Sequence, residues 1–175
     1  MTAPTWTARR LLALEEAQIE QLTDVLIDCV EGGASVNFMD PLPRERAIAF
    51  WRGVAAAVEK GDRALLVVDD AHGVCGTVQL VLTQPDNQPH RADLSKMLVH
   101  RRARRSGAGE SLLRAAESLA RASAKTLLVL DTASPDAERL YERVGWVRVG
   151  VIPGYALLPR GGLCATTFYY RELAG

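Results

Sequence analysis

Apolar side chains recur at helical spacing in two segments near the start of the chain. Over residues 19–29 they lie three or four positions apart, which predicts an amphipathic helix that ends at Gly32 and Gly33. Residues 48–58 repeat the pattern after Pro43, a residue type that suits the start of a helix. We therefore expect two helices before the main run of strands.

Short runs of apolar and β-branched residues predict the first strands of a sheet. They cover residues 5–12, 64–68 and 74–83. The polar segment 69–73 separates the last two runs and is typical of a hairpin turn. We expect these segments to form one separate strand and one β-hairpin.

The next expected strand, residues 92–99, changes its alternation partway along. Ala92 and Leu94 share one parity, whereas Met97 and Val99 share the other. A β-bulge would reset the phase. A strand covered on both faces would give the same pattern, so both interpretations stay open.

Helix and strand patterns alternate after this strand. A helix from Gly107 and a buried strand over residues 126–130 complete a βαβ unit, in which the two strands run parallel. Ser134 and Pro135 then suit the N-cap and the first position of a further helix, and Gly145 suits its end. The sequence therefore predicts a parallel pair of strands inside the sheet.

Two strand-like segments close the chain. Residues 146–152 and 164–172 flank a turn at residues 153–154 and a loop at residues 159–162. The last strand could pair across a homodimer if it lies at an edge of the sheet. The order of all these elements predicts a mixed-sheet α/β (α+β) fold.

Composition restricts the classes of function. The chain has 175 residues with no repeat or linker, so we expect residues 1–175 to form a single domain. Lysine plus arginine equals aspartate plus glutamate, at 21 each, which favours a small-molecule partner over nucleic acid or an anionic membrane. The three cysteines show no metal-ligand spacing and fit a reducing cytoplasm. No segment has the length and apolarity of a membrane span.

The segment VHRRARRSGAGE, residues 99–110, lies between a predicted strand and a predicted helix. Free N–H groups and the helix dipole favour an anion at such a position. Glycines let the backbone approach a ligand closely, and arginines add bidentate phosphate contacts. A diphosphate is the ligand that this combination suits.

There are four other interpretations of this segment, and the first two lack residues that they require. A dinucleotide fingerprint would need a glycine where Leu112 stands, and a Walker A loop would need a Gly-Lys-Ser/Thr sequence that is absent. Arg101, Arg102, Arg104 and Arg105 could bind nucleic acid, although no aromatic residues are interleaved with them. A solvated turn that caps a helix is the simplest alternative.

Two motifs in this order resemble those of the GNAT acetyltransferases. RxxGxG at residues 104–109 is similar to the acetyl-CoA-binding motif of that family, and SxxAxxLYxxxGW at residues 134–146 is similar to its Asn-x-x-Ala-x-x-Leu/Phe-Tyr-x-x-x-Gly-Phe pattern. Ser134 and Trp146 depart from that pattern. The resemblance implies a GNAT fold, with a central splayed, mostly antiparallel sheet of about seven strands, about four helices and acetyl-CoA as cofactor.

The resemblance also implies which residues hold acetyl-CoA. Backbone groups of Met97, Leu98 and Val99 would hold the pantetheine arm, and the amides from Arg105 to Glu110 would bind the pyrophosphate. The implied cofactor positions are Met97, Leu98, Val99, Arg104, Arg105, Ser106, Gly107, Ala108, Gly109, Glu110, Ser134, Ala137 and Tyr141.

Three side chains are candidates for the chemistry. Tyr141 stands where GNAT enzymes often keep a general acid, and a phenol can donate to a leaving thiolate; its helical spacing also suits a core residue. Asp93 and Asp131 are carboxylates in apolar strands, and either could bind the substrate ammonium or act as base. Asp131 could also be a turn acceptor, and Asp93 an exposed strand residue.

Further short segments resemble the tabtoxin-resistance type of acetyltransferase. They are residues 32–39, 92–94 and 153–155. The resemblance implies that the acceptor lies near Gly33, Ser35, Phe38 and Tyr155. We expect transfer of acetyl to a primary amine of a small polar molecule, of the kind found in amino-acid-like toxins or antibiotics. A protein or peptide acetyltransferase and a non-catalytic CoA-binding module are the alternatives.

Overall fold

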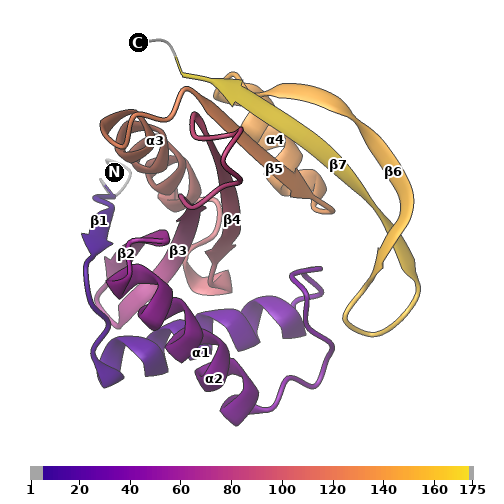
Figure 1. Ribbon diagram of the computed structural model, residues 1–175. Helices are drawn as coiled ribbons and strands as arrows, with labels where there is room; N and C mark the ends of the chain where they lie inside the picture. The colour runs from indigo at the N-terminus through magenta and orange to yellow at the C-terminus, as the bar shows by residue number, and fades with distance from the viewer. Residues whose placement is uncertain (1–5, 174–175) are drawn as a thin grey trace.

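The computed structural model describes residues 6–173 and contains one mixed sheet with helices on both faces (Figure 1). The N-terminal elements are β1 (Arg9–Leu11), α1 (Glu16–Glu31), α2 (Arg44–Glu59), β2 (Arg63–Asp70), β3 (Gly73–Val81) and β4 (Arg91–Val99). They are followed by the 3₁₀ turn η1 (Arg101–Ala103), α3 (Ala108–Ala122), β5 (Leu127–Thr132), α4 (Pro135–Arg143), β6 (Val147–Leu157) and β7 (Leu163–Glu172). The predicted mixed, mostly antiparallel α/β fold is confirmed.

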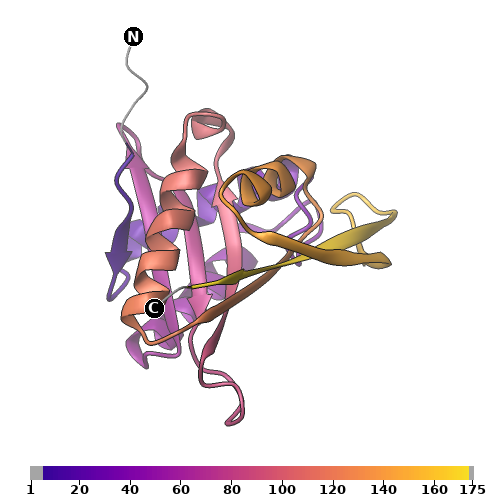
Figure 2. The same ribbon diagram turned by 90° about the horizontal axis from the view of Figure 1, so that it is seen from above.

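The seven strands lie in the order β1-β2-β3-β4-β5-β7-β6. Among the strands of residues 6–173, only β4 and β5 are parallel neighbours, as the βαβ pattern predicted. They pair over three residues each, Arg91–Asp93 against Leu127–Val129, and then diverge toward their carboxyl ends (Figures 1 and 2). The sheet is therefore splayed at the point where open α/β sheets place their ligands.

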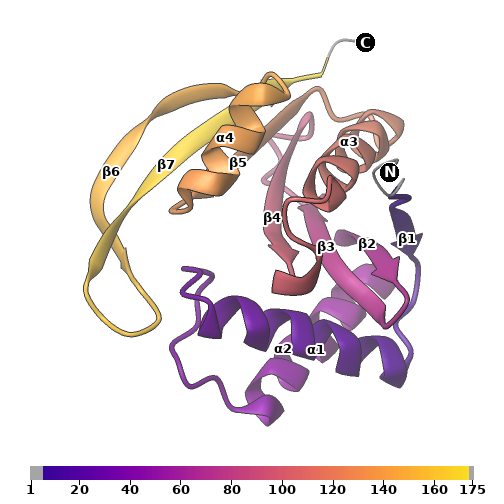
Figure 3. The same ribbon diagram turned by 180° about the vertical axis from the view of Figure 1, so that it is seen from behind.

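Each face of the sheet has its own hydrophobic core. On one face Leu112 of α3 and Tyr141 of α4 pack against the inner strands. On the other face Leu22 of α1 and Trp51 of α2 pack against β2 and β3, and Figure 3 shows both helices crossing the sheet there. The predicted amphipathic faces of α1, α2 and α3 are the buried ones.

The bulge in β4 is confirmed. Lys96 has φ +49°, and the pairing of β3 with β4 shifts register between Thr77 and Gln79. As a result Met97 packs on the same face as Leu94, whereas Leu98 enters the core on the opposite face. The bulge accounts for the change of parity along this strand.

The structure differs from the prediction in three details, in the first strand and in the last two strands. The first strand is shorter than residues 5–12, and Thr5 lies outside the described residues. Pro153-Gly154 is not the hairpin turn, because β6 continues through it with a register irregularity; proline is tolerated there since β6 is the edge strand. The strand β7 lies between β5 and β6, so it has no free edge with which to pair across a homodimer.

Candidate active site

The glycine turn has a fixed and unusual backbone. Gly107 is the N-cap of α3 with φ +95°, and Arg105 also has a positive φ of 58°. The Trp6 indole donates to the Ser106 carbonyl at 2.9 Å, and the Ser111 hydroxyl donates to the Trp6 carbonyl at 3.1 Å. The first N–H groups of α3, from Ala108 onward, lack acceptors within the helix and are available for an anion.

The turn is also tied to the neighbouring elements. Arg104 donates through Nε to the Val99 carbonyl at 3.0 Å, which joins the start of the motif to the end of β4. Gly109 packs so closely on α4 that an added Cβ would lie 3.2 Å from Leu140. The two motifs found in the sequence are therefore in direct contact.

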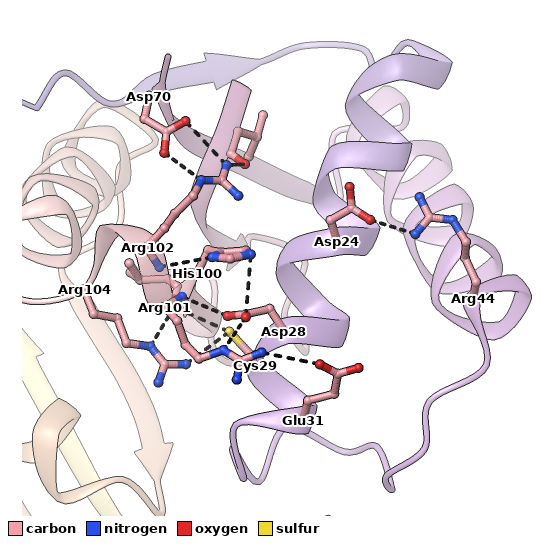
Figure 4. A network of polar contacts seen from close by, with 12 residues as sticks. Asp24, Asp28, Cys29, Glu31, Arg44, Asp70, His100, Arg101, Arg102 and Arg104 are labelled. Carbon is pink, nitrogen blue, oxygen red and sulfur yellow. Dashed lines mark hydrogen bonds and ion pairs between the residues drawn. The ribbon is translucent and has the colours of Figure 1, made fainter. Parts of the chain in front are cut away.

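Two of the arginines before the turn are closely paired with acids (Figure 4). Arg101 donates to Asp28 of α1 from both its backbone N–H, at 2.8 Å, and its Nε, at 2.5 Å. Arg102 pairs with Asp70 at 2.7 Å. Among the described residues Arg104 has no acidic partner and donates to the Val99 carbonyl instead, and Arg105 is 87% exposed with its nearest acid, Asp136, 3.9 Å away. Close ion pairs therefore neutralise Arg101 and Arg102, which reduces the basic surface that could bind nucleic acid.

Asp28 was not identified from the sequence, although it holds the segment before the glycine turn. It is 6% exposed, and besides Arg101 it lies 3.6 Å from the imidazole of His100. The N–H of Arg102 donates to the other ring nitrogen of His100 at 3.2 Å. Asp28 does not lie on the predicted apolar face of the helix, so the local pattern gave no signal that it would be buried with a partner.

Tyr141 lies on α4, buried between two aromatic rings. Its ring is 5.8 Å from those of Trp146 and Tyr169, and 3% of the residue is exposed. Burial raises the pKa of the phenol well above its usual value, and the nearby charge of Asp131 raises it further. Tyr141 is thus a core residue whose buried phenol holds its proton more firmly than a free tyrosine does.

Asp131 and Asp93 have different surroundings. Asp131 is exposed at the carboxyl end of β5, where the hydroxyl of Thr166 donates to it at 2.7 Å. Asp93 forms an ion pair with Arg91 and accepts a hydrogen bond from Gln84 at 3.4 Å. Tyr141 packs on Tyr169, which pairs in register with Leu130, the residue before Asp131. Asp93 instead lies near the start of β4, at the other end of the strand.

The start of α4 follows the predicted capping pattern. The Ser134 hydroxyl accepts a hydrogen bond from the Ala137 N–H at 3.3 Å, and Pro135 occupies the first helical position. Ala137 packs against the core on the side of α3. The serine that replaces the usual asparagine is therefore engaged as a helix cap.

The predicted acceptor residues lie on two segments that meet. Ser35 of the α1–α2 loop donates to the Leu157 carbonyl at 3.3 Å, and Gly33 turns the chain there with φ +91°. Phe38 packs edge-on against Phe50, with ring centroids 5.3 Å apart. Tyr155 on β6 is half exposed and packs against Phe168 of β7.

The contact between this loop and the β6–β7 hairpin was not predicted. Arg160 at the hairpin tip pairs with Asp40 at 2.9 Å and donates to the Glu31 carbonyl at 2.9 Å. The Asp40 N–H donates to the Pro159 carbonyl at 2.9 Å. Nothing local in either segment indicates this partner, because about 120 residues separate them.

The described residues offer no candidate for two other kinds of site. Within residues 6–173 no helix is long and apolar enough to cross a membrane. The same residues contain no group of three or more histidine, cysteine or carboxylate side chains placed to hold a metal ion.

Comparison with known proteins identifies the family. A profile of the acetyltransferase (GNAT) domain matches residues 61–148. An uncharacterized N-acetyltransferase from the hisH-hisA intergenic region of Azospirillum brasilense is 33% identical over 128 residues, which cover 71% of this chain and 74% of that protein.

Solved structures show the same fold. An N-acetyltransferase from Staphylococcus aureus Mu50 superposes with a TM-score of 0.79 at 15% identity, covering 98% of this chain and all of that one. A GNAT superfamily phosphinothricin acetyltransferase from Sinorhizobium meliloti, solved with AcCoA, gives 0.78 at 18% identity, covering 98% and 90% of the two chains. A ribosomal-protein-alanine N-acetyltransferase from Brucella melitensis gives 0.78 at 20% identity, covering 95% and 99%.

Proposed function

The chain belongs to the GNAT family and is an acetyl-CoA-dependent N-acetyltransferase, and we propose that it acetylates a primary amine of a small polar molecule. The proposal takes residues 1–175 as one catalytic domain. The observation that carries it is the position of Asp131 at the carboxyl end of β5, one register position from Tyr169 on which Tyr141 packs, beside the divergence of β4 and β5. A carboxylate and a protonated phenol at one place are the groups that amine acetylation requires.

The residues on the cofactor side fit acetyl-CoA. The pairing of β4 with β5 ends at Asp93, so the edge of β4 up to Val99 has no strand partner on that side. An extended pantetheine arm can take hydrogen bonds from such an edge. Gly107, with its positive φ, presents the start of α3 to the pyrophosphate. The proposed cofactor residues are those of the first motif and β4, together with Ser134, Ala137 and Tyr141.

Two side chains would carry out the proton chemistry. Acetyl-CoA supplies an activated acetyl group and a thiolate leaving group. The phenolic oxygen of Tyr141 stays protonated across the physiological pH range, because its pKa is raised, and it can donate to the leaving sulfur. Asp131, open to solvent and hydrogen-bonded by Thr166, can bind the acceptor ammonium and take its proton. Asp93 is the weaker candidate, since its carboxylate already forms an ion pair with Arg91.

The acceptor is proposed to be amino-acid-like, as in the tabtoxin-resistance type. The neighbour from Sinorhizobium meliloti is a phosphinothricin acetyltransferase, which supports this direction. In the chain itself, Asp131 and Thr166 present polar groups on the sheet, and Tyr155 and Phe168 present apolar ones beside them. Such a mixture suits a compact polar molecule with one apolar segment.

The test is an acetyl-transfer screen with purified protein, acetyl-CoA and a panel of small amines and peptides, read by thiol release and by mass of the product. We expect turnover with small primary amines that exceeds turnover with every peptide. Peptides as the only substrates would contradict the small-molecule acceptor. Binding of acetyl-CoA with no turnover on any amine would contradict the enzymatic proposal.

Two matched variants distinguish the roles of the two carboxylates. Asp131→Asn should lower kcat/KM for the amine by about 10- to 100-fold, as expected when a charged hydrogen bond is lost. Asp93→Asn should lower it by less than about threefold, because it loses only a partly exposed ion pair. The reverse ranking would move the base or ammonium-binding role to Asp93.

A further inference from the structure

Lys96 lies at the bulge of β4, and its backbone has a conformation that residues other than glycine rarely adopt. Its φ is +49°, and the bulge places it where β4 has already separated from β5. Bulges are frequent beside active sites, where they re-aim a side chain. A residue held in this conformation by its surroundings is a candidate for a functional role.

The ammonium of Lys96 has charged neighbours but no partner. Among residues 6–173 its side chain makes no hydrogen bond and no ion pair within 4.0 Å. Partial burial lowers its pKa, Arg63 lowers the pKa further, and Asp131 acts in the opposite direction. Lysine side chains are seldom fully buried unless they are paired, and Lys96 is partly buried with no anion within ion-pair distance among the described residues.

A second donor without an acceptor lies on the next strand. Gln79 of β3 pairs in register with Ser95, the residue before Lys96, and is fully buried. Its Nε2 has no hydrogen-bond partner among the described residues, whereas its Oε1 accepts from Arg63 at 2.8 Å. Arg63, Gln79 and Lys96 thus gather donors and positive charge on one part of the sheet.

Asp131 provides an opposite charge at the carboxyl end of β5, beyond the point where β4 and β5 separate. It forms no ion pair with Lys96, and its charge raises the pKa of that ammonium. An amino acid carries the complementary pair of charges, an ammonium and a carboxylate, a short distance apart. Both charges of such a molecule would find a counter-charge here.

We propose that Lys96 binds a compact oxyanion of the acceptor, such as an α-carboxylate, while Asp131 binds the ammonium of the same molecule. Lys96 is then the residue that selects amines carrying an anionic group over simple amines. This inference rests on the proposed function and specifies its substrate class.

The experiment measures binding of matched ligands to the CoA-loaded protein by calorimetry, with acetyl transfer as a second readout. The probes are the common L-amino acids and the amines left by their decarboxylation, for example methionine with 3-methylthiopropylamine and histidine with histamine. We expect at least one amino acid to bind about 10- to 100-fold more tightly than its decarboxylated amine.

Lys96→Met should abolish this preference by weakening only the amino acid, while the affinity for CoA stays unchanged. Lys96→Arg should retain part of the preference, since it keeps the charge. Lys60→Met, at an exposed position after α2, is the matched control and should behave as wild type.

The outcomes distinguish this inference from the proposed function. Equal binding of both members of every pair, or no binding of any, would overturn it. So would a Lys96→Met protein that loses the amino acid and the simple amine equally, because that result would indicate a role as base or in folding. A Lys96-dependent preference in binding without acetyl transfer would support the anion site and contradict the proposed reaction.

Discussion

The inner strands and the β6–β7 hairpin differ in how they are covered. Residues 64–68 of β2 are all buried, and helices pack on both faces of β2 and β3. Along β6, by contrast, Val149 is 68% exposed, and Leu163 at the start of β7 is 72% exposed. One region is a closed core, and the other is an arm held mainly by strand pairing and by Arg160 at its tip.

This difference separates two tasks. The proposed cofactor turn is attached to the closed core, where Trp6, Asp28 and Gly109 hold its backbone. The proposed acceptor residues lie where the arm meets the α1–α2 loop, a contact made of a few exposed polar bonds. We infer that cofactor geometry is rigid, whereas the acceptor region can vary without disturbing it.

The largest effect is expected at the junction of the two regions. Tyr141→Phe should lower kcat by about 10²- to 10⁴-fold, because it removes the proton donor while keeping the ring in the core. The Kd for acetyl-CoA, measured by calorimetry, should stay within about threefold of wild type. Full turnover in this variant would show that Tyr141 serves only as a core residue.

A substitution at the glycine turn should affect cofactor affinity next. Gly107→Val places a β-branched residue at φ +95° and should weaken acetyl-CoA binding by about 10- to 100-fold, with a loss of about 1–3 kcal/mol in unfolding free energy. Gly53→Ala, in an open position of α2, is the control. It should stabilise the protein by about 0.5–1 kcal/mol and leave the affinity unchanged. Equal acetyl-CoA affinities in the wild type and in both variants would show that the turn is not part of the cofactor site.

The closed core should be sensitive to a polar contact that explains the unusual Trp146. Its indole donates to the buried carboxylate of Glu117 on α3 at 2.9 Å. Trp146→Phe should cost about 1–3 kcal/mol in urea unfolding, because that carboxylate loses its donor. In a Glu117→Leu background the same change should cost less than about 1 kcal/mol. Equal costs in both backgrounds would mean that ring size, rather than the hydrogen bond, is responsible.

The arm should show the smallest effect on stability. Arg160→Ala removes an ion pair whose arginine is 71% exposed and should change the unfolding free energy by less than about 1 kcal/mol. We nevertheless expect a higher KM for the amine and an unchanged KM for acetyl-CoA in steady-state kinetics. A loss of acetyl-CoA affinity would break the proposed separation of the two regions.

Local patterns were sufficient to predict most of the fold. Helical spacing located α1, α2 and α3, and cap residues located α4. The parity change in residues 92–99 allowed a bulge, and the structure places Lys96 in it. The prediction of a turn at Pro153-Gly154 was wrong, because β6 is an edge strand and can contain a proline that an inner strand could not. The edge position of β6 follows from the strand order, which depends on long-range pairing.

The candidate site was predictable only where a motif is local. The glycine turn and the cap at Ser134 could be predicted because each is formed by neighbouring residues. The pairing of Arg101 with Asp28 joins residues 73 positions apart, and Arg160 finds Asp40 across 120. The proposed preference for Asp131 over Asp93 likewise depends on where α4 lies. The positions of the two carboxylates in the sequence do not give that information.

The central claim is that acetyl-CoA binds along the end of β4 and the glycine turn, not in the arm. Amide hydrogen exchange followed by mass spectrometry, with and without saturating acetyl-CoA, tests it directly. We predict slower exchange in peptides covering residues 97–110 and little change in peptides covering residues 147–163. Protection confined to the arm, with none at the glycine turn, would contradict the account.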